Sequence, residues 1–173
     1  MNTHNWLRLV HIVTGAFWVG TAVFVATILV PAIRAVGPNG GAVMRELMEK
    51  RKLPIVLTTM SFVTIISGSI LAWRDAGALG FRWFERGAGL GFGLGAVAAI
   101  AATIIGLGIN MPTAKKISAM MARVQTEGRA PNELEAAQLR KMQGTMFTAG
   151  RVTALLLLIA TALMATARDF GAS

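Results

Sequence analysis

The chain has 173 residues, of which 54% are hydrophobic and only 14% are charged, where a soluble domain carries about a quarter charged residues. Composition therefore excludes a soluble globular protein and predicts an integral membrane protein. Lys and Arg number 17 against 8 Asp and Glu, but these charges form short clusters between apolar runs, so we expect no nucleic-acid partner. Because the chain has no cysteine, disulfides, thiolate metal sites, iron–sulfur clusters and covalent haem attachment are excluded.

Four apolar stretches approach or exceed the roughly 20 helical residues that cross a hydrocarbon core about 30 Å thick. Residues 9–33, 53–73 and 87–111 contain no Lys, Arg, Asp or Glu. Residues 152–167 are fewer, but the stretch 143–167 is long enough if Arg151 lies near an interface. We predict an all-α, four-helix transmembrane bundle that forms a single integral membrane domain over residues 1–173. Its helices are expected at about residues 6–33, 53–73, 87–124 and 132–168.

The first helix carries both histidines of the chain, since His4, Arg8 and His11 follow one another at i, i+4 and i+7. This spacing stacks the three side chains along one helix face. Counted from Trp6, His11 lies roughly 7.5 Å along the axis, just inside the hydrocarbon. An ionisable group at that depth indicates function by default. The alternative, given equal weight, is an imidazole bonded to a neighbouring hydroxyl or carbonyl group.

The first connection and the second helix have polar patterns. Residues 36–41 predict a turn, and residues 42–51 a short amphipathic helix. The second helix carries six hydroxyl side chains: Thr58, Thr59, Ser61, Thr64, Ser67 and Ser69. They either form a polar stripe toward the bundle or bond their own backbone carbonyls.

The third helix begins with alternating glycines, among them Gly87, Gly91 and Gly95 at four-residue spacing. In lipid, such small side chains let two helix backbones approach closely. We favour a contact within the chain over a dimer contact. The apolar pattern continues past Pro112 to Val124, which predicts a helix that is kinked at the proline and extends into the cytoplasm.

The fourth helix is preceded by a break at residues 128–131. Asn132 and Glu135 then have the spacing of an N-cap residue and its reciprocal glutamate. We therefore expect the fourth helix to begin near Asn132, well outside the membrane.

Orientation follows from the basic residues of the short connections. The first connection holds Arg34, Arg45, Lys50, Arg51 and Lys52, and the third holds Lys115, Lys116, Arg123, Arg129, Arg140 and Lys141. The middle connection and the tail hold only Arg74, Arg82, Arg86 and Arg168. We predict that both termini face outward, that the basic connections lie in the cytoplasm near anionic lipid heads, and that the protein resides in the bacterial inner membrane.

Several chemistries are excluded by what the apolar spans contain. Because no Asp or Glu lies in them, a carboxylate proton relay has no groups to use. A two-haem b-type cytochrome needs four axial histidines, and the chain has two. His4 and His11 are separated by roughly 10.5 Å along a helix and cannot share one iron. A single b-type haem would need His11 plus a second ligand or an open position.

Residues 9–20 of the first helix, Leu9-Val-His11-Ile-Val-Thr-Gly-Ala-Phe-Trp18-Val-Gly20, with Pro31 near its end, resemble the opening helix of the HemJ/CopD-like superfamily, whose members begin with L-H-I…W-x-G. The basic stretch Glu49-Lys-Arg51-Lys-Leu ahead of Thr58-Thr-Met-Ser resembles the entry into the second helix of that superfamily. The resemblance covers about the first half of the chain and the four-helix count.

The resemblance implies a haem or copper role. HemJ-type protoporphyrinogen oxidases are thought to hold a b-type haem through the histidine that corresponds to His11, and to need a lysine where this chain has Arg86. Arginine stays protonated and offers no lone pair, so that lysine's role does not transfer unchanged. CopD-type relatives are associated with copper handling, for which His4, His11 and Met1 are the candidate ligands.

Our leading hypothesis is one b-type haem or porphyrin bound near the outer face, with His11 as the iron ligand. Five arginines are expected at the outer helix ends, and of these Arg8, Arg74 and Arg86 are the candidates to pair with propionates. The alternative is snorkelling at the interface, which needs no ligand. The alternatives are a non-catalytic subunit that packs its glycine face in a homodimer or larger membrane complex, and a copper-transport accessory.

Overall fold

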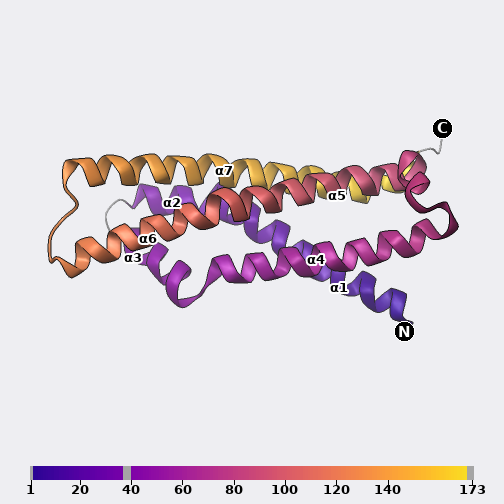
Figure 1. The fold of residues 1–173 in the computed structure, drawn as a ribbon, viewed down its shortest axis with the longest axis horizontal. Helices are drawn as coiled ribbons and strands as arrows, with labels where there is room; N and C mark the ends of the chain where they lie inside the picture. The colour runs from indigo at the N-terminus through magenta and orange to yellow at the C-terminus, as the bar shows by residue number, and fades with distance from the viewer. Residues whose placement is uncertain (1, 37–39, 171–173) are drawn as a thin grey trace.

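The computed structural model describes residues 2–36 and 40–170, and these residues form helices and no strands (Figure 1). Four helical stretches are long and apolar enough to cross a membrane: Thr3–Ala35, Leu53–Glu85, Gly87–Thr126 and Glu133–Ala165. The all-α class and the four apolar helices are therefore confirmed.

The first stretch comprises α1 (Thr3–Phe24), a π-helical segment η1 (Val25–Leu29) and α2 (Val30–Ala35). The third comprises α5 (Gly87–Ile105), a π-helical segment η5 (Gly106–Asn110) and α6 (Met111–Thr126). In both, a proline follows the π segment by two residues, at Pro31 and Pro112. A proline lacks the amide donor and its ring crowds the carbonyl four residues earlier, and a wider turn relieves this. The irregularity expected at Pro112 is thus a π segment just ahead of it.

The first connection contains α3 (Gly40–Arg45) and a π-helical segment η3 (Glu46–Lys50), close to the short helix expected at residues 42–51. Of the turn expected at residues 36–41, residues 37–39 lie outside the described residues, and the prediction is wrong for Gly40 and Gly41, which begin α3. The second stretch comprises α4 (Leu53–Ala76), which is close to the predicted 53–73, and a 3₁₀ segment η4 (Gly77–Glu85) that is interrupted at Gly80. Gly77 and Gly80 adopt positive φ in η4, a conformation that glycine adopts without steric cost.

The fourth stretch is a single helix, α7 (Glu133–Ala165), followed by a 3₁₀ turn η6 (Ala167–Asp169). Asn132 caps α7 as predicted: its side chain accepts from the Glu135 amide at 2.9 Å, and the Glu135 carboxylate accepts from the Asn132 amide at 2.9 Å. Gly128 turns the preceding connection with φ of 63°. This confirms the helix start outside the apolar span.

Both ends of the described chain lie at the same end of the molecule, together with η4 and η6, while α2, α3 and the α6–α7 connection lie at the opposite end (Figure 1). The two most basic connections are therefore neighbours. We call this second end the basic end.

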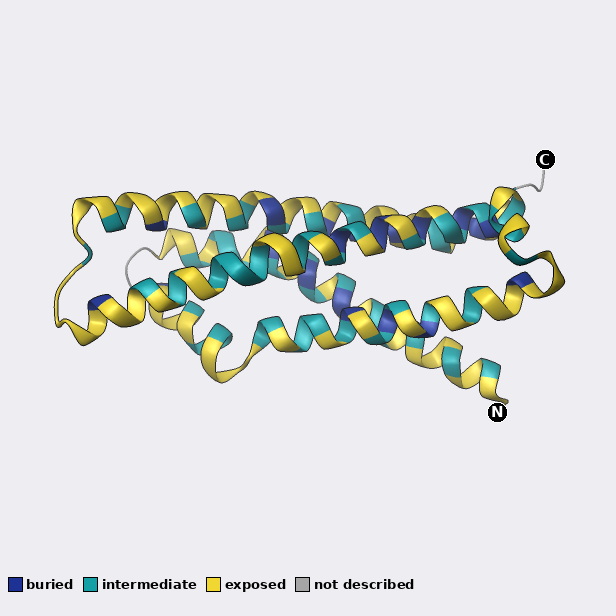
Figure 2. Ribbon diagram, viewed as in Figure 1, coloured by how far each residue is buried: buried dark blue, intermediate teal, exposed yellow. Residues whose placement is uncertain are grey.

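Small residues dominate the core, where Trp18 and Leu157 pack with Ala22, Ala98, Ala99, Ala102 and Ala160. Most of the outward helix surface is exposed (Figure 2) and carries large apolar side chains, such as Phe17, Ile66 and Val97. An apolar exterior of this extent is unusual for a soluble monomer and fits contact with a lipid bilayer.

Candidate functional site

His11 lies in the contact between α1 and α4. Its Nδ1 is 2.8 Å from the backbone carbonyl oxygen of Thr64, and 3.5 Å from the hydroxyl oxygen of Ser67. The side chain is partly buried. The bonded imidazole that the sequence left open as an alternative is therefore present.

The carbonyl partner determines which ring nitrogen of His11 carries the proton. A carbonyl oxygen can only accept, so in the neutral ring Nδ1 must donate, and Nε2 keeps its lone pair. Among the described residues Nε2 has no hydrogen-bond partner. A metal-binding histidine typically has this arrangement, in which one ring nitrogen donates to a carbonyl and the other is left for the metal. The structural contact and the ligand hypothesis are thus compatible.

Gly68 of α4 makes room for the His11 ring. A Cβ atom at this position would lie 2.7 Å from Cε1, 3.0 Å from Nδ1 and 3.6 Å from Nε2 of His11. Real Cβ contacts are essentially never as close as the first of these distances. The Nδ1–Cε1 edge therefore faces α4 at a glycine, and Nε2 is the nitrogen farther from it.

Hydroxyl groups next to His11 also take part in the contact between α1 and α4. Thr64 donates to the Thr14 hydroxyl at 2.9 Å, and Ser67 donates to the Val63 carbonyl at 2.6 Å. Thr64 and Ser67 are buried, at 7% and 4% exposure. We call His11, Thr14, Thr64 and Ser67 the α1–α4 polar seam. The second helix was expected to show either a polar stripe toward the bundle or hydroxyls bonded to their own backbone, and both hold in part. Ser67 faces the bundle and also bonds its own backbone, whereas Thr59 and Ser69 are exposed.

The predicted propionate partners Arg8, Arg74 and Arg86 are exposed, and the start of α1, the end of α4 and the start of α5 lie at the same end of the molecule (Figure 1). Arg8 is one turn from His11 on α1, Arg74 lies near the end of α4, and Arg86 is the N-cap residue of α5. Within residues 2–36 and 40–170, none of the three side chains makes an ion pair or contacts His11 through a hydrogen bond. Their guanidinium groups are thus available to an anion.

The copper ligand set receives no structural support. His4 lies two turns before His11 on α1, and Met1 lies outside the described residues. In the part of the chain that the structure describes, no group of three or more His, Cys, Asp or Glu side chains could hold a metal ion.

The glycines of α5 pack against the C-terminal half of α7 and its extension. A Cβ atom on Gly91 would lie 2.7 Å from Cα of Ala167, and one on Gly95 would lie 2.7 Å from Cγ of Met164 and 3.1 Å from the carbonyl oxygen of Ala160. The small-residue face therefore serves a contact within the chain. We call this contact the α5–α7 glycine seam.

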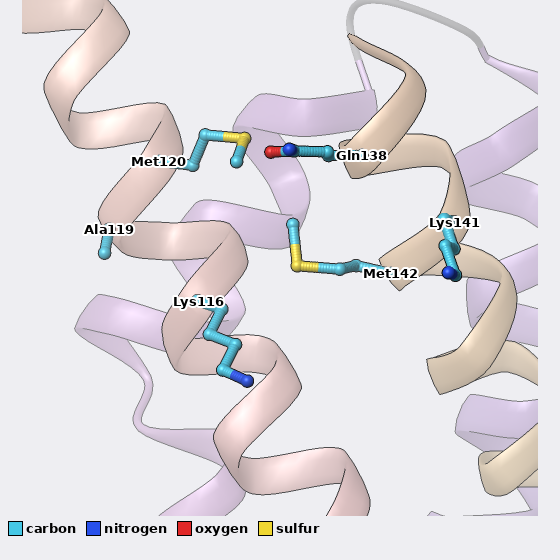
Figure 3. A pocket seen from close by; sticks show the side chains of 6 residues that line it. All are labelled: Lys116, Ala119, Met120, Gln138, Lys141 and Met142. Carbon is cyan, nitrogen blue, oxygen red and sulfur yellow. The ribbon is translucent and has the colours of Figure 1, made fainter. Parts of the chain in front are cut away.

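Two open hollows lie away from His11. One, of about 420 Å³, is lined by Lys116, Ala119, Met120, Gln138, Lys141 and Met142 between α6 and α7 (Figure 3). The other, of about 470 Å³, lies between the η5 region and α7 and is lined by Ile105, Ile109, Gly144, Thr145, Thr148, Ala149 and Val152. Neither is lined by a candidate ligand.

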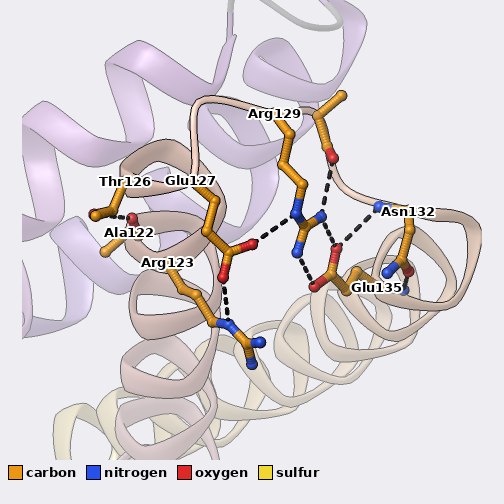
Figure 4. A network of polar contacts seen from close by, with 8 residues as sticks. Ala122, Arg123, Thr126, Glu127, Arg129, Asn132 and Glu135 are labelled. Atoms are coloured by element: carbon orange, nitrogen blue, oxygen red, sulfur yellow. Dashed lines mark hydrogen bonds and ion pairs between the residues drawn. The ribbon is translucent and has the colours of Figure 1, made fainter.

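An ion-pair network joins α6 to α7 at the basic end (Figure 4). Arg129 bonds Glu127 at 2.6 Å and binds both carboxylate oxygens of Glu135, at 2.6 and 2.8 Å. Hydrogen bonds from Arg129 and from the Asn132 amide lower the pKa of Glu135 to about 2, and those from Arg123 and Arg129 lower the pKa of Glu127. These groups precede the apolar stretch 143–167, and their contacts fix the conformation of the α6–α7 connection.

Sequence reasoning identified His11 but not its partners. Gly68 and the Thr64 carbonyl lack a sequence motif, since a glycine in a helix and a main-chain oxygen gain meaning only once α1 and α4 are placed together. The hydroxyl spacing of α4 was the one available signal. No known protein family, curated protein or solved structure matches this chain in the comparisons made.

Proposed function

We propose that this chain is a multi-pass protein of the bacterial inner membrane that binds one b-type haem or porphyrin near the outer face, with Nε2 of His11 as the iron ligand. The supporting observation is the 2.8 Å contact of His11 Nδ1 with the Thr64 carbonyl. It holds the ring, sets the tautomer and leaves a lone pair on Nε2.

The residues present fit this group in their donor chemistry. A neutral imidazole is a common axial ligand of haem iron, and Gly68 admits the ring without steric conflict. Arg8, Arg74 and Arg86 would supply cations for the two propionates. A bound haem would supply one-electron chemistry. The chain's own contribution is to orient His11 through Thr64 and to exclude water with the apolar faces of α1 and α4.

The proposed orientation places the termini outward and the basic end in the cytoplasm. Basic residues concentrate in the two connections that lie together at the basic end, as the positive-inside rule requires. A reporter fused at Ser173 should behave as periplasmic, and one inserted near Gly128 as cytoplasmic. A cytoplasmic Ser173 would reverse the placement of His11.

Absorption spectra of protein purified in mild detergent and supplied with haem test the ligand. Wild type should show a Soret band, and His11→Ala should lose it while remaining folded. His11→Asn is a sharper variant, because the asparagine amide keeps an N–H donor near the place of Nδ1 but offers nothing in place of Nε2. It should also lose the band.

His4→Ala is the matched control and should keep the spectrum of wild type. Arg8→Ala, Arg74→Ala and Arg86→Ala should weaken haem retention without removing the ligand, since each loses a charge-assisted bond of about 1.5–3 kcal/mol. A wild-type protein without a Soret band, or a His11→Asn protein with an unchanged band, overturns the proposal.

The alternative of an assembly subunit relied on the glycine face of α5. That face packs against α7 and η6 of the same chain, so it is not offered to another subunit.

A further inference from the structure

Two arginines share one aromatic ring at the basic end. The guanidinium carbons of Arg34, at the end of α2, and of Arg151, on α7, each lie 4.1 Å from the centroid of the Phe147 ring. Their separation is therefore at most twice that distance. Arg34 also donates from Nη2 to the carbonyl oxygen of Gln143 at 2.8 Å. Two chain segments more than a hundred residues apart thus bring two positive charges together.

Carboxylates do not accompany this pair. Residues 1–45 and 136–168 contain no Asp or Glu, so neither Arg34 nor Arg151 has a carboxylate within ten residues of it in the sequence. Among the described residues, the ion pairs of the basic end join Lys50, Arg51, Arg123 and Arg129 to Glu46, Glu127 and Glu135. Neither Arg34 nor Arg151 takes part. Two like charges held this close are stabilised when an anion binds between or beside them.

Both guanidinium groups keep N–H donors that are open to an acceptor. A cation–π contact depends on the positive charge lying over the ring face, so it does not use up the hydrogen-bonding capacity of these donors. Apart from the Nη2 bond of Arg34, the described residues give these donors no partner. Both arginines are exposed. Planar N–H pairs of this kind match the oxygens of a phosphate group.

Depth in the molecule indicates the source of the phosphate. Arg34 directly follows the uncharged run 9–33, and Arg151 is the one charged residue within the stretch 143–167. Both thus lie at the boundary between apolar helix and basic end, where lipid headgroups of a bilayer are located. A soluble phosphate would meet the connections farther out first.

We propose that Arg34, Phe147 and Arg151 form a binding site for the phosphate of an anionic phospholipid in the leaflet at the basic end. The site rests on the proposed membrane embedding and is independent of haem binding, since it lies at the other end of the molecule. Phe147 holds the two guanidinium groups in place, and their N–H donors bind the phosphodiester oxygens.

The test is titration of membrane-extracted, delipidated protein with phosphatidylglycerol in a phosphate-free maltoside detergent, read by native mass spectrometry. Wild type should retain one lipid molecule with an affinity at least about tenfold above that of the double variant Arg34→Gln/Arg151→Gln. Arg34→Lys/Arg151→Lys keeps both charges but loses the planar fork, and should be several-fold weaker than wild type. Lys116→Gln/Lys141→Gln is the matched control, because it removes two basic charges at the same end and should bind as wild type does.

Equal affinities of wild type and both arginine variants overturn the site, as does an equal loss in the lysine control, which would indicate net charge alone. Helix content measured on every variant shows whether the fold is retained. Inorganic phosphate is titrated in parallel. Displacement of the lipid by millimolar inorganic phosphate, with the same dependence on both arginines, overturns the lipid as the source. Extraction of the protein from membranes by carbonate would contradict the membrane proposal instead.

Discussion

The α5–α7 glycine seam and the α1–α4 polar seam both bring two helices close, by opposite means. In the glycine seam, Gly91 and Gly95 meet Ala160, Met164 and Ala167, and no side-chain hydrogen bond is needed. In the polar seam, His11 and Thr14 meet Thr64 and Ser67 through hydrogen bonds, and Gly68 supplies the space for the His11 ring.

The difference separates packing from function. Small residues suffice to hold two helices together in lipid, because close backbone approach supplies the van der Waals contact. A histidine is not needed for that purpose and is expensive within an apolar span. The polar seam therefore contains an ionisable side chain that helix packing does not require. The glycine seam contains only the small residues that close packing requires.

The largest effect should follow from filling the glycine seam. In Gly91→Leu the new side chain would meet the backbone of Ala167, which cannot rotate away, so we expect destabilisation of about 3 kcal/mol or more. Thermal unfolding in detergent measures it. Gly20→Leu, where a Cβ atom meets nothing within 4 Å, should be tolerated. Equal stability of the two variants would show that the glycine face of α5 meets only lipid.

A smaller loss of stability is expected for Gly68→Ala at the polar seam. The added Cβ forces the His11 ring away from α4 and costs its bond to Thr64, a loss of about 1 kcal/mol. Haem affinity should fall as well, because the ring loses its orientation. Gly15→Ala is the control, since its Cβ atom would lie an ordinary 3.4 Å from Cγ2 of Thr64. An unchanged Gly68→Ala protein would contradict the close fit.

A smaller effect is expected for the hydroxyl pair of the polar seam. A double-mutant cycle of Thr14→Val and Thr64→Val should give a coupling energy of about 0.6 kcal/mol, the size typical of hydrogen bonds between membrane helices. Chemical unfolding of the four proteins measures it. A coupling energy of zero would mean that these hydroxyls contribute only through their own helices.

The smallest effect on stability is expected from the exposed ion-pair network of Arg129 and Glu135 at the basic end. Carbon-13 NMR titration should place the pKa of Glu135 at about 2, and Arg129→Gln should raise that pKa toward its ordinary value. Because the folded pKa is lowered, the stabilisation is present above the ordinary pKa and is lost as pH falls toward 2. An ordinary pKa in wild type would show that the network is not populated in solution.

Much of the fold could be predicted from local sequence, and the site only in part. Uncharged runs marked the four helices, and Asn132 with Glu135 marked the start of α7, since each signal lies within one element. Arg34, Phe147 and Arg151 come together only in the folded chain, and so do His11 and Gly68. Membership of the HemJ/CopD-like superfamily remains a prediction from the residues of the first two helices.

The central claim is that the polar seam presents His11 with a proton on Nδ1 and a lone pair on Nε2. Nitrogen-15 NMR of histidine-labelled protein without haem, with His4→Ala used for assignment, reads the tautomer of His11 directly. We predict a neutral ring protonated at Nδ1, and its conversion by Gly68→Ala to a mixture of tautomers. A wild-type ring protonated at Nε2 would contradict both the contact with Thr64 and the availability of His11 as a ligand.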